Sequence, residues 1–238
     1  MRLDDVIHPS WEPVRAYLNM EPLYSFNREV LPVTPYVPDQ MDIFNVFSMP
    51  LGDIRVVILG QDPYPRPGDA NGHAFSVNHG TPLPYSLKRI LSEMTREFPG
   101  IMVNQQQWGT LEHLSAQGVF LLNTALTTRK GEAGSHLREW EGFTKRVIEY
   151  ICLKNPCIWM LWGQKAQSFI PCIYHNPYTV KKGGGDIPYG DYNYILKSAH
   201  PAADHYNPVN SFHGCGHFSM ANKILKHNRL KEISWLGT

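Results

Sequence analysis

The segment Arg55–Tyr64, which reads Arg-Val-Val-Ile-Leu-Gly-Gln-Asp-Pro-Tyr, constrains the fold of this chain more than any other. Its apolar, β-branched-rich run Val56–Leu59 is typical of a strand buried in a parallel sheet. The run ends at Gly60, and Asp62 follows on a loop that Pro63 stiffens. In open α/β sheets, ligands bind beyond the carboxyl ends of the strands. The segment therefore predicts a strand followed by a functional carboxylate. The same ten residues are also compatible with a strand followed by an ordinary Asp-Pro turn.

Further apolar runs alternate with segments of helical periodicity. The other predicted strands are Val119–Leu122, Ile158–Leu161 and Tyr194–Leu196. The predicted helices are Ser86–Glu97, Gly109–Gln117, Trp140–Leu153, Gln164–Ile170 and Phe218–Asn228. Strands that alternate with helices imply βαβ units and a parallel sheet. We therefore expect an α/β protein with one domain over residues 1–238. Its central four-stranded, mainly parallel sheet should carry helices on both faces, after a helical and proline-rich lead-in over residues 1–50.

The composition narrows the classes of function. With 42% hydrophobic and 18% charged residues, the chain has the composition of a soluble globular protein. Its formal net charge of +1 excludes a strong overall basic field, so a nucleic acid would be bound through local charge, backbone N–H groups and hydroxyls. No run is long enough to span a membrane, and the first residues lack the apolar core of a signal peptide. The four cysteines form neither a disulfide framework nor a paired zinc motif. We expect a monomer that is not secreted and does not bind membranes, located in the cytoplasm or nucleus.

Polar side chains follow three of the predicted strands. Asp62 follows the first strand, Asn123 the second and His200 the fourth, so all three should meet at one edge of the sheet. Taken alone, His200 would more often be a structural histidine and Asn123 a cap or turn residue. Their coincidence at one edge favours a shared site.

The chemistry of these groups suits a nucleobase. An amide such as Asn123 both donates and accepts, and Tyr64 or Phe75 offers a flat face for stacking. Asp62 could orient water or stabilise positive charge, and a neutral His200 could donate to an oxygen that becomes anionic. No second carboxylate is evidently paired with Asp62, which argues against the usual two-carboxylate glycosidase scheme.

From about Leu51 to Trp235, a series of motifs resembles those of the family 1 uracil-DNA glycosylases. Residues 60–64 are similar to the family's water-activating loop, and residues 72–77 to the segment whose aromatic ring stacks on uracil. Residues 82–87 resemble its proline-rich loop, residues 121–127 its uracil-reading strand end, and residues 161–167 its Gly-Ser loop region. Residues 200–201 and 214–218 resemble its DNA-intercalation loop and the helix that follows.

The resemblance implies a DNA repair enzyme that flips deoxyuridine out of DNA and hydrolyses its N-glycosidic bond, without a lyase step, a metal or a cofactor. The product would be uracil and an abasic site. The resemblance implies catalytic roles for Asp62 and His200, and uracil binding by Gln61, Tyr64, Phe75 and Asn123. It implies DNA binding by Pro82, Pro84, Ser86, Gly163, Gln164, Pro201 and Ala202, and by Asp204 at the place of the family's wedge residue. The partners would be single- or double-stranded uracil-containing DNA and inhibitor proteins that mimic DNA.

The chain departs from the family pattern at three places. Pro65 stands where a histidine is usual, and Gln164 replaces the serine of the Gly-Ser loop. Asp204 takes the place of the leucine that enters the duplex as a wedge, and the segment from His200 onward is about two residues longer than usual. We expect Tyr206 to fill the gap in the base stack instead.

Two alternatives remain open at this point. The chain could be a DNA-binding or replication-accessory protein that depends little on the chemistry of the fold, although such a protein would have no need of the complete set of site residues. His213, Cys215 and His217 alternate along an extended segment and could form a metal site, but no fourth ligand is evident.

Overall fold

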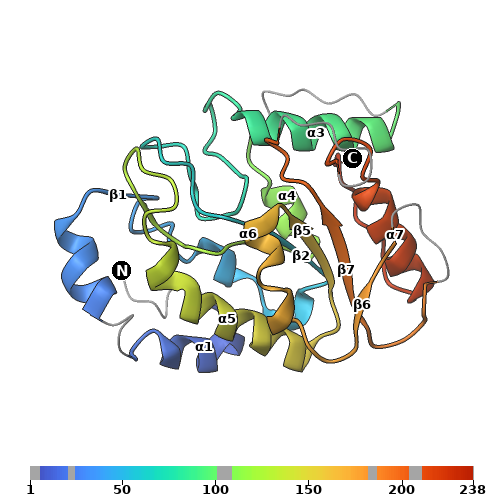
Figure 1. Ribbon diagram of the computed structural model, residues 1–238, viewed down its shortest axis with the longest axis horizontal. Coiled ribbons are helices and arrows are strands. Elements are labelled where there is room, and N and C mark those ends of the chain that lie inside the picture. Colours follow the sequence, from blue (N-terminus) through green and yellow to red (C-terminus); the bar gives the residue numbers. More distant parts are fainter. Residues whose placement is uncertain (1–5, 21–24, 101–108, 182–186, 204–210, 238) are drawn as a thin grey trace.

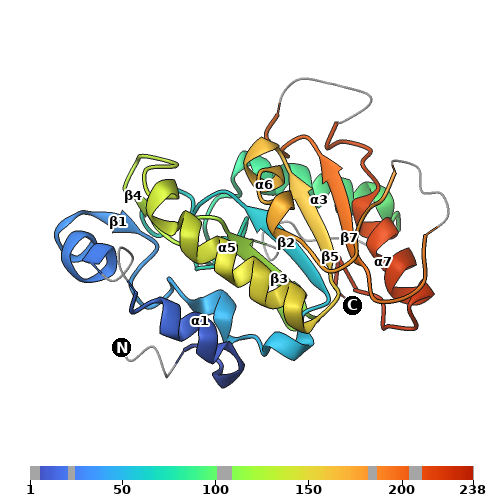
Figure 2. The ribbon, with the colours of Figure 1, turned by 60° about the horizontal axis from the view of Figure 1, so that its bottom comes forward.

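The computed structural model describes residues 6–20, 25–100, 109–181, 187–203 and 211–237. Its central sheet has five parallel strands in the order β3-β2-β5-β7-β6 (Figure 1 labels β2, β5, β7 and β6, and Figure 2 labels β3). These strands are β2 (Val56–Gly60), β3 (Val119–Asn123), β5 (Ile158–Trp162), β6 (Pro177–Thr179) and β7 (Asn193–Ser198). A separate antiparallel pair joins β1 (Tyr36–Val37) to β4 (Thr128–Arg129).

The predicted α/β class is confirmed, but the predicted number of four strands in the sheet is wrong. The fifth strand, β6, lies at the edge of the sheet and pairs in parallel with β7. It has three residues, begins with Pro177, and has exposed residues at both ends. An edge strand tolerates proline because it needs only one row of ladder hydrogen bonds. The segment therefore lacks the buried apolar run by which the other four strands were predicted.

Each predicted helical segment contains a helix, although two of these helices are shorter than expected. The helices are α1 (Glu12–Tyr17), α3 (Tyr85–Glu97), α4 (Glu112–Ser115), α5 (Leu137–Lys154), α6 (Gln164–Gln167) and α7 (His217–His227). Short 3-10 turns occupy Pro9–Trp11, Leu31–Val33, Asn45–Ser48, Leu51–Asp53 and Ile170–Cys172, and a π-helical turn spans Phe26–Val30. Within the described ranges, no helix combines the length and apolar character that a membrane span requires.

Helices cover both faces of the sheet, as predicted (Figures 1 and 2). Along β2, Val57 and Leu59 belong to the core layer that contains the apolar residues of α1 and α5. Val56 and Ile58 belong to the opposite layer, with the apolar residues of α3, α4 and α7. Each core strand is therefore buried on both sides, which explains its uninterrupted apolar sequence.

The carboxyl ends of four strands meet at one edge of the sheet. Gly60 at the end of β2 pairs in register with Asn123 at the end of β3. Trp162 at the end of β5 pairs with Ser198 at the end of β7. Asn123 and the segments that follow these strands carry the predicted site residues.

Candidate active site

Asp62 is held by hydrogen bonds to both of its carboxylate oxygens. The backbone N–H of Gly134 donates to Oδ2 at 2.5 Å, and the side-chain amide of Gln61 donates to Oδ1 at 3.1 Å. Burial raises the pKa of the Asp62 carboxyl above its usual value, and hydrogen bonds from Gly134, Gln61 and Thr128 oppose part of that rise. The result is an oriented carboxylate, half-buried on the loop after β2.

Asn123 presents a buried acceptor that no donor in the described parts of the chain satisfies. The residue is 4% exposed, and its Oδ1 atom has no hydrogen-bond partner among the described residues. A Cβ atom at Gly60 would lie 2.5 Å from this oxygen, so glycine at the end of β2 gives the amide its room. Buried polar atoms without partners are rare in folded proteins, and each requires an explanation. A ligand that donates a hydrogen bond would satisfy this one.

Phe75 and Tyr64 lie together beside the strand ends. Phe75 has a φ of 64°, a left-handed conformation that bulky residues rarely adopt and that commonly marks a functional site. The Tyr64 hydroxyl donates to the Phe75 carbonyl at 3.2 Å and lies 2.9 Å from the Ser86 hydroxyl. Ser86 is 8% exposed at the start of α3, so the proline-rich loop is joined directly to the two aromatic residues.

His200 is fixed as one tautomer of the neutral ring. Its Nδ1 accepts a hydrogen bond from the Ala202 backbone N–H at 3.1 Å, so the proton of the neutral ring is on Nε2. Burial lowers the pKa of His200 below its usual value, which favours this neutral form. The ring centroids of His200 and Phe75 are 5.9 Å apart. At Gly163, which has a φ of 85°, a Cβ atom would approach His200 Cβ to 2.9 Å.

Trp162 and His217 support the aromatic part of the site. The sequence suggested His217 only as a ligand of the alternative metal site and Trp162 only as part of the Gly-Ser loop region, and it did not predict their contact. The Trp162 ring lies 5.5 Å from the Phe75 ring, and its indole N–H donates to His217 Nδ1 at 3.0 Å. No local sequence signal could have shown this contact, because the two residues are 55 positions apart.

The alternative metal site of His213, Cys215 and His217 is not formed. His217 Nδ1 is engaged by Trp162, and the Cys215 sulfur lies within 4.8 Å of carboxylate oxygens of Glu93 and Glu97 instead. Among the predicted DNA contacts, Pro82, Gln164 and Ala202 are exposed, whereas Pro201 is buried and Pro84 is half-buried. Asp204 and Tyr206 lie outside the described residues.

The described groups form a complementary set for a planar heterocycle. Asn123 offers an acceptor, His200 Nε2 offers a donor, and Phe75 offers a ring face, with the Asp62 carboxylate on the neighbouring loop. An N–H beside a carbonyl oxygen on the ligand would satisfy the Asn123 amide.

Comparison with known proteins gives one consistent result. The family model of the uracil DNA glycosylase superfamily matches residues 48–226. A uracil-DNA glycosylase of Pseudomonas entomophila (strain L48) is 36% identical over 230 residues, covering 95% of this chain and 88% of that protein. A uracil-DNA glycosylase of Salmonella agona (strain SL483) is 41% identical over 206 residues, covering 85% of this chain and 81% of that protein.

Solved structures agree with the sequence comparisons. The crystal structure of mimivirus uracil-DNA glycosylase superposes with a TM-score of 0.78 at 27% identity, covering 99% of this chain and 89% of that chain. A variant of mimivirus UNG in complex with UGI superposes with a TM-score of 0.76 at 28% identity, covering 99% of this chain and 91% of that chain.

Proposed function

The chain belongs to the uracil-DNA glycosylase superfamily and removes uracil from DNA in base excision repair, and we propose that Asp62, Asn123 and His200 carry out this reaction. The observation that carries the proposal is the buried Oδ1 atom of Asn123, for which the described part of the protein offers no hydrogen-bond donor. Uracil has an N3–H group between two carbonyl oxygens, so it supplies the donor that this atom lacks.

Base selection follows from hydrogen-bond pattern and shape. Asn123 accepts from N3–H of uracil and donates to O4, whereas cytosine presents an acceptor at N3 and a donor at the neighbouring position. Tyr64 lies against C5, where the methyl group of thymine would clash. Phe75 stacks on the base, and the backbone at Gln61 contacts it. The hydrogen bonds that Thr124 and Ala125 donate to the Gln61 carbonyl, at 2.6 to 2.9 Å, support this placement.

Bond cleavage separates charge, and the two catalytic groups stabilise the separated charges. As the bond between C1′ and N1 breaks, its electron pair passes to uracil and positive charge develops on the sugar. His200 Nε2–H donates to O2 of the uracil anion, while the Asp62 carboxylate stabilises the cation and orients the water that adds to C1′. Both interactions strengthen only in the transition state, so they raise kcat. The added water loses one proton through the Asp62 carboxylate to solvent, and the released uracil anion takes up one proton from solvent.

DNA would lie across the edge that carries these loops. We assign Pro82, Pro84, Ser86, Gly163, Gln164, Pro201 and Ala202 to contacts with its backbone. UGI is bound in a solved mimivirus UNG complex, and we propose that UGI also binds this chain, over the same edge. The enzyme acts inside the cell, where its substrate is found.

The assignment of catalytic roles is tested with a uracil-containing oligonucleotide, followed by alkali and a gel. Asp62→Asn and His200→Ala should each lower kcat by about 10²–10³-fold or more, since each removes transition-state stabilisation. Asp53→Asn, an exposed carboxylate before β2, is the matched control and should retain wild-type turnover. Near wild-type turnover in Asp62→Asn or His200→Ala would refute the assigned role of that residue.

A further inference from the structure

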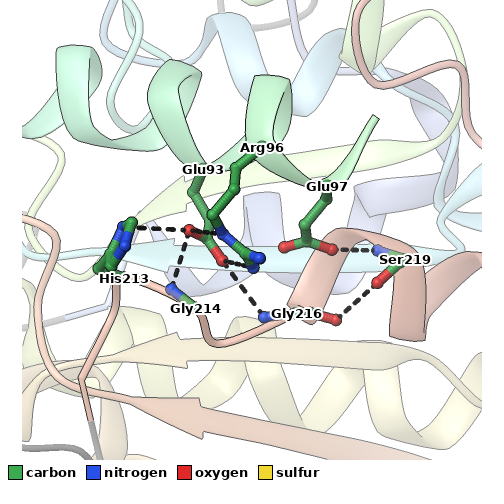
Figure 3. Close-up of polar contacts among 7 residues, drawn as sticks. All are labelled: Glu93, Arg96, Glu97, His213, Gly214, Gly216 and Ser219. Carbon is green, nitrogen blue, oxygen red and sulfur yellow. Dashed lines mark hydrogen bonds and ion pairs between the residues drawn. The ribbon is translucent and has the colours of Figure 1, made fainter. Parts of the chain in front are cut away.

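Glu93 on α3 joins that helix to the segment that leads into α7 (Figure 3). Its side chain is 1% exposed, although it carries a carboxylate. The backbone N–H groups of Gly214 and Gly216 donate to its two oxygens at 2.9 and 3.3 Å. Arg96 donates to the same two oxygens at 2.9 and 2.7 Å, and His213 Nδ1 lies 3.7 Å away. This buried carboxylate thus fixes two backbone positions more than a hundred residues away.

The charge on Glu93 is strongly favoured in the folded protein. Burial alone would raise its pKa, but the hydrogen bonds from Arg96, Gly214 and Gly216 outweigh that effect and hold the pKa at about 2. Glu97, one helical turn further along α3, is arranged differently. It accepts from the Ser219 backbone N–H at 2.6 Å, and its Oε1 atom is buried and has no hydrogen-bond partner within the described ranges.

The segment that Glu93 holds packs directly against Trp162. The Phe212 and Trp162 ring centroids are 5.0 Å apart, and His217 Nδ1 accepts the indole N–H of Trp162. Gly214 and Gly216, the two positions that Glu93 fixes, lie between Phe212 and His217. Trp162 in turn lies beside Phe75, which stands beside His200. A continuous chain of contacts therefore runs from the Glu93 carboxylate to the site.

We infer that Glu93 is a positioning residue for uracil binding: it fixes residues 212–217 so that Trp162 holds the Phe75 ring in its stacking position. Glu93 itself contacts neither base nor DNA in this assignment. The inference rests on the proposed stacking role of Phe75. A continuous path of contacts does not by itself demonstrate energetic coupling, so the test measures binding at the base-binding site itself.

Free uracil is the probe, because it occupies the site without the rest of the DNA. Its inhibition constant is measured against cleavage of a uracil-containing oligonucleotide. Glu93→Ala should weaken inhibition by uracil by about tenfold and lower kcat/KM by up to about 100-fold, as small misplacements in an active site do. Glu93→Gln keeps one acceptor oxygen, so its effect should be intermediate. Glu97→Gln is the matched control on the same helix and should leave both quantities within about twofold of wild type, because a glutamine can still accept from Ser219.

Wild-type inhibition by uracil in a folded Glu93→Ala variant would overturn the inference. If that variant does not fold, Trp162→Phe decides instead, because it keeps a ring beside Phe75 but removes the indole N–H that binds His217. The Trp162→Phe variant should also weaken inhibition, and unchanged inhibition would overturn the inference. Phe75→Ala distinguishes this failure from a failure of the proposed function. If Phe75→Ala does not weaken uracil inhibition, Phe75 is not the stacking residue, whatever the Glu93 variants show.

Discussion

At the scale of single residues, burial shifts the pKa values of the two proposed catalytic groups in opposite directions. The pKa of Asp62 is raised above its usual 3.8, and the pKa of His200 is lowered below its usual 6.5. The proposed mechanism needs an ionised Asp62 and a neutral His200, and both forms are present above these two pKa values. On acidification both groups gain protons, His200 at a lower pH and Asp62 at a higher pH than usual.

We therefore predict that kcat/KM on uracil-containing DNA is independent of pH above about 6.5 and falls on the acid side as both groups gain protons. The slope of log kcat/KM against pH should approach 2 at the lowest pH, since two groups are protonated together. Steady-state kinetics across this range, with circular dichroism to monitor folding, provide the measurement. Loss of activity as the pH rises from about 6.5 to 8 would show instead that His200 acts as the imidazolium.

Base selectivity also belongs to single residues. Tyr64→Ala should admit thymine because it opens space at C5, and Asn123→Asp should admit cytosine when its carboxyl is protonated. Both variants should have lower overall rates. In Tyr64→Ala, the preference for uracil over thymine, which differ at this position by one methyl group, should fall by about 10–200-fold. Tyr64→Phe keeps the ring and loses only the hydroxyl contacts, so it should still reject thymine. Assays on thymine- and cytosine-containing duplexes decide, and unchanged discrimination in Tyr64→Ala and Asn123→Asp would mean that other residues select the base.

The sequence predicted which polar residues meet but not what holds them in place. Asp62 and Asn123 could be predicted because each stands at or just past the end of a buried strand. The donor to Asp62, Gly134, is 72 positions away, and that contact depends on the packing of the loop before α5. Glu93 was missed for a similar reason, since a charged residue in a helix is ordinarily solvated.

At the scale of elements, short uninterrupted apolar runs predicted four strands, whereas β6 has no such run. What orders this edge of the sheet is Asn193, the first residue of β7, whose side chain is 1% exposed. Its Oδ1 accepts from the Cys157 backbone N–H at 3.1 Å and from the Trp159 indole at 2.9 Å. Its Nδ2 donates to the carbonyls of Tyr174 and His175 at 2.9 and 3.0 Å. One amide thus ties β5, β7 and the segment before β6 together.

Asn193→Ala should therefore destabilise the protein by about 3 kcal/mol or more, because it leaves several buried groups without partners. For a chain of this length, that corresponds to a fall in Tm of roughly 6–12 °C. Calorimetry provides the measurement, and kcat at a temperature well below the transition should be unchanged. Asn78→Ala is the matched control, since Asn78 donates to the Gly68 and Ala70 carbonyls near the surface and should cost about 1 kcal/mol or less. Equal losses in the two variants would contradict the role given to Asn193.

At the scale of the whole molecule, the site exists only when the sheet is complete. Its residues come from the end of β3 and from the segments after β2, β5 and β7, which together span most of the chain. Alternation of strands and helices was sufficient to predict this edge, because parallel strands place all their carboxyl ends on the same side. The order of the strands could not be predicted, since it depends on which buried faces pack together.

The charge of the whole molecule leads to a last prediction, on salt dependence. The chain has 22 basic and 21 acidic residues, and the proposed DNA contacts Pro82, Pro84, Ser86, Gly163 and Gln164 are all uncharged. Uncharged donors bind phosphates without releasing counterions, and each phosphate that a lysine or arginine neutralises contributes about −0.9 to the slope of log affinity against log salt. The slope for uracil-containing duplex DNA should therefore be shallower than about −5, the value for six neutralised phosphates.

Gln164→Lys, an exposed position at the start of α6, should steepen the slope by about 0.9 and tighten binding at low salt. Asn19→Lys adds the same charge at an exposed position just after α1 and should leave the slope unchanged. Equal slopes for Gln164→Lys and the wild type would show that the DNA backbone does not pass over α6.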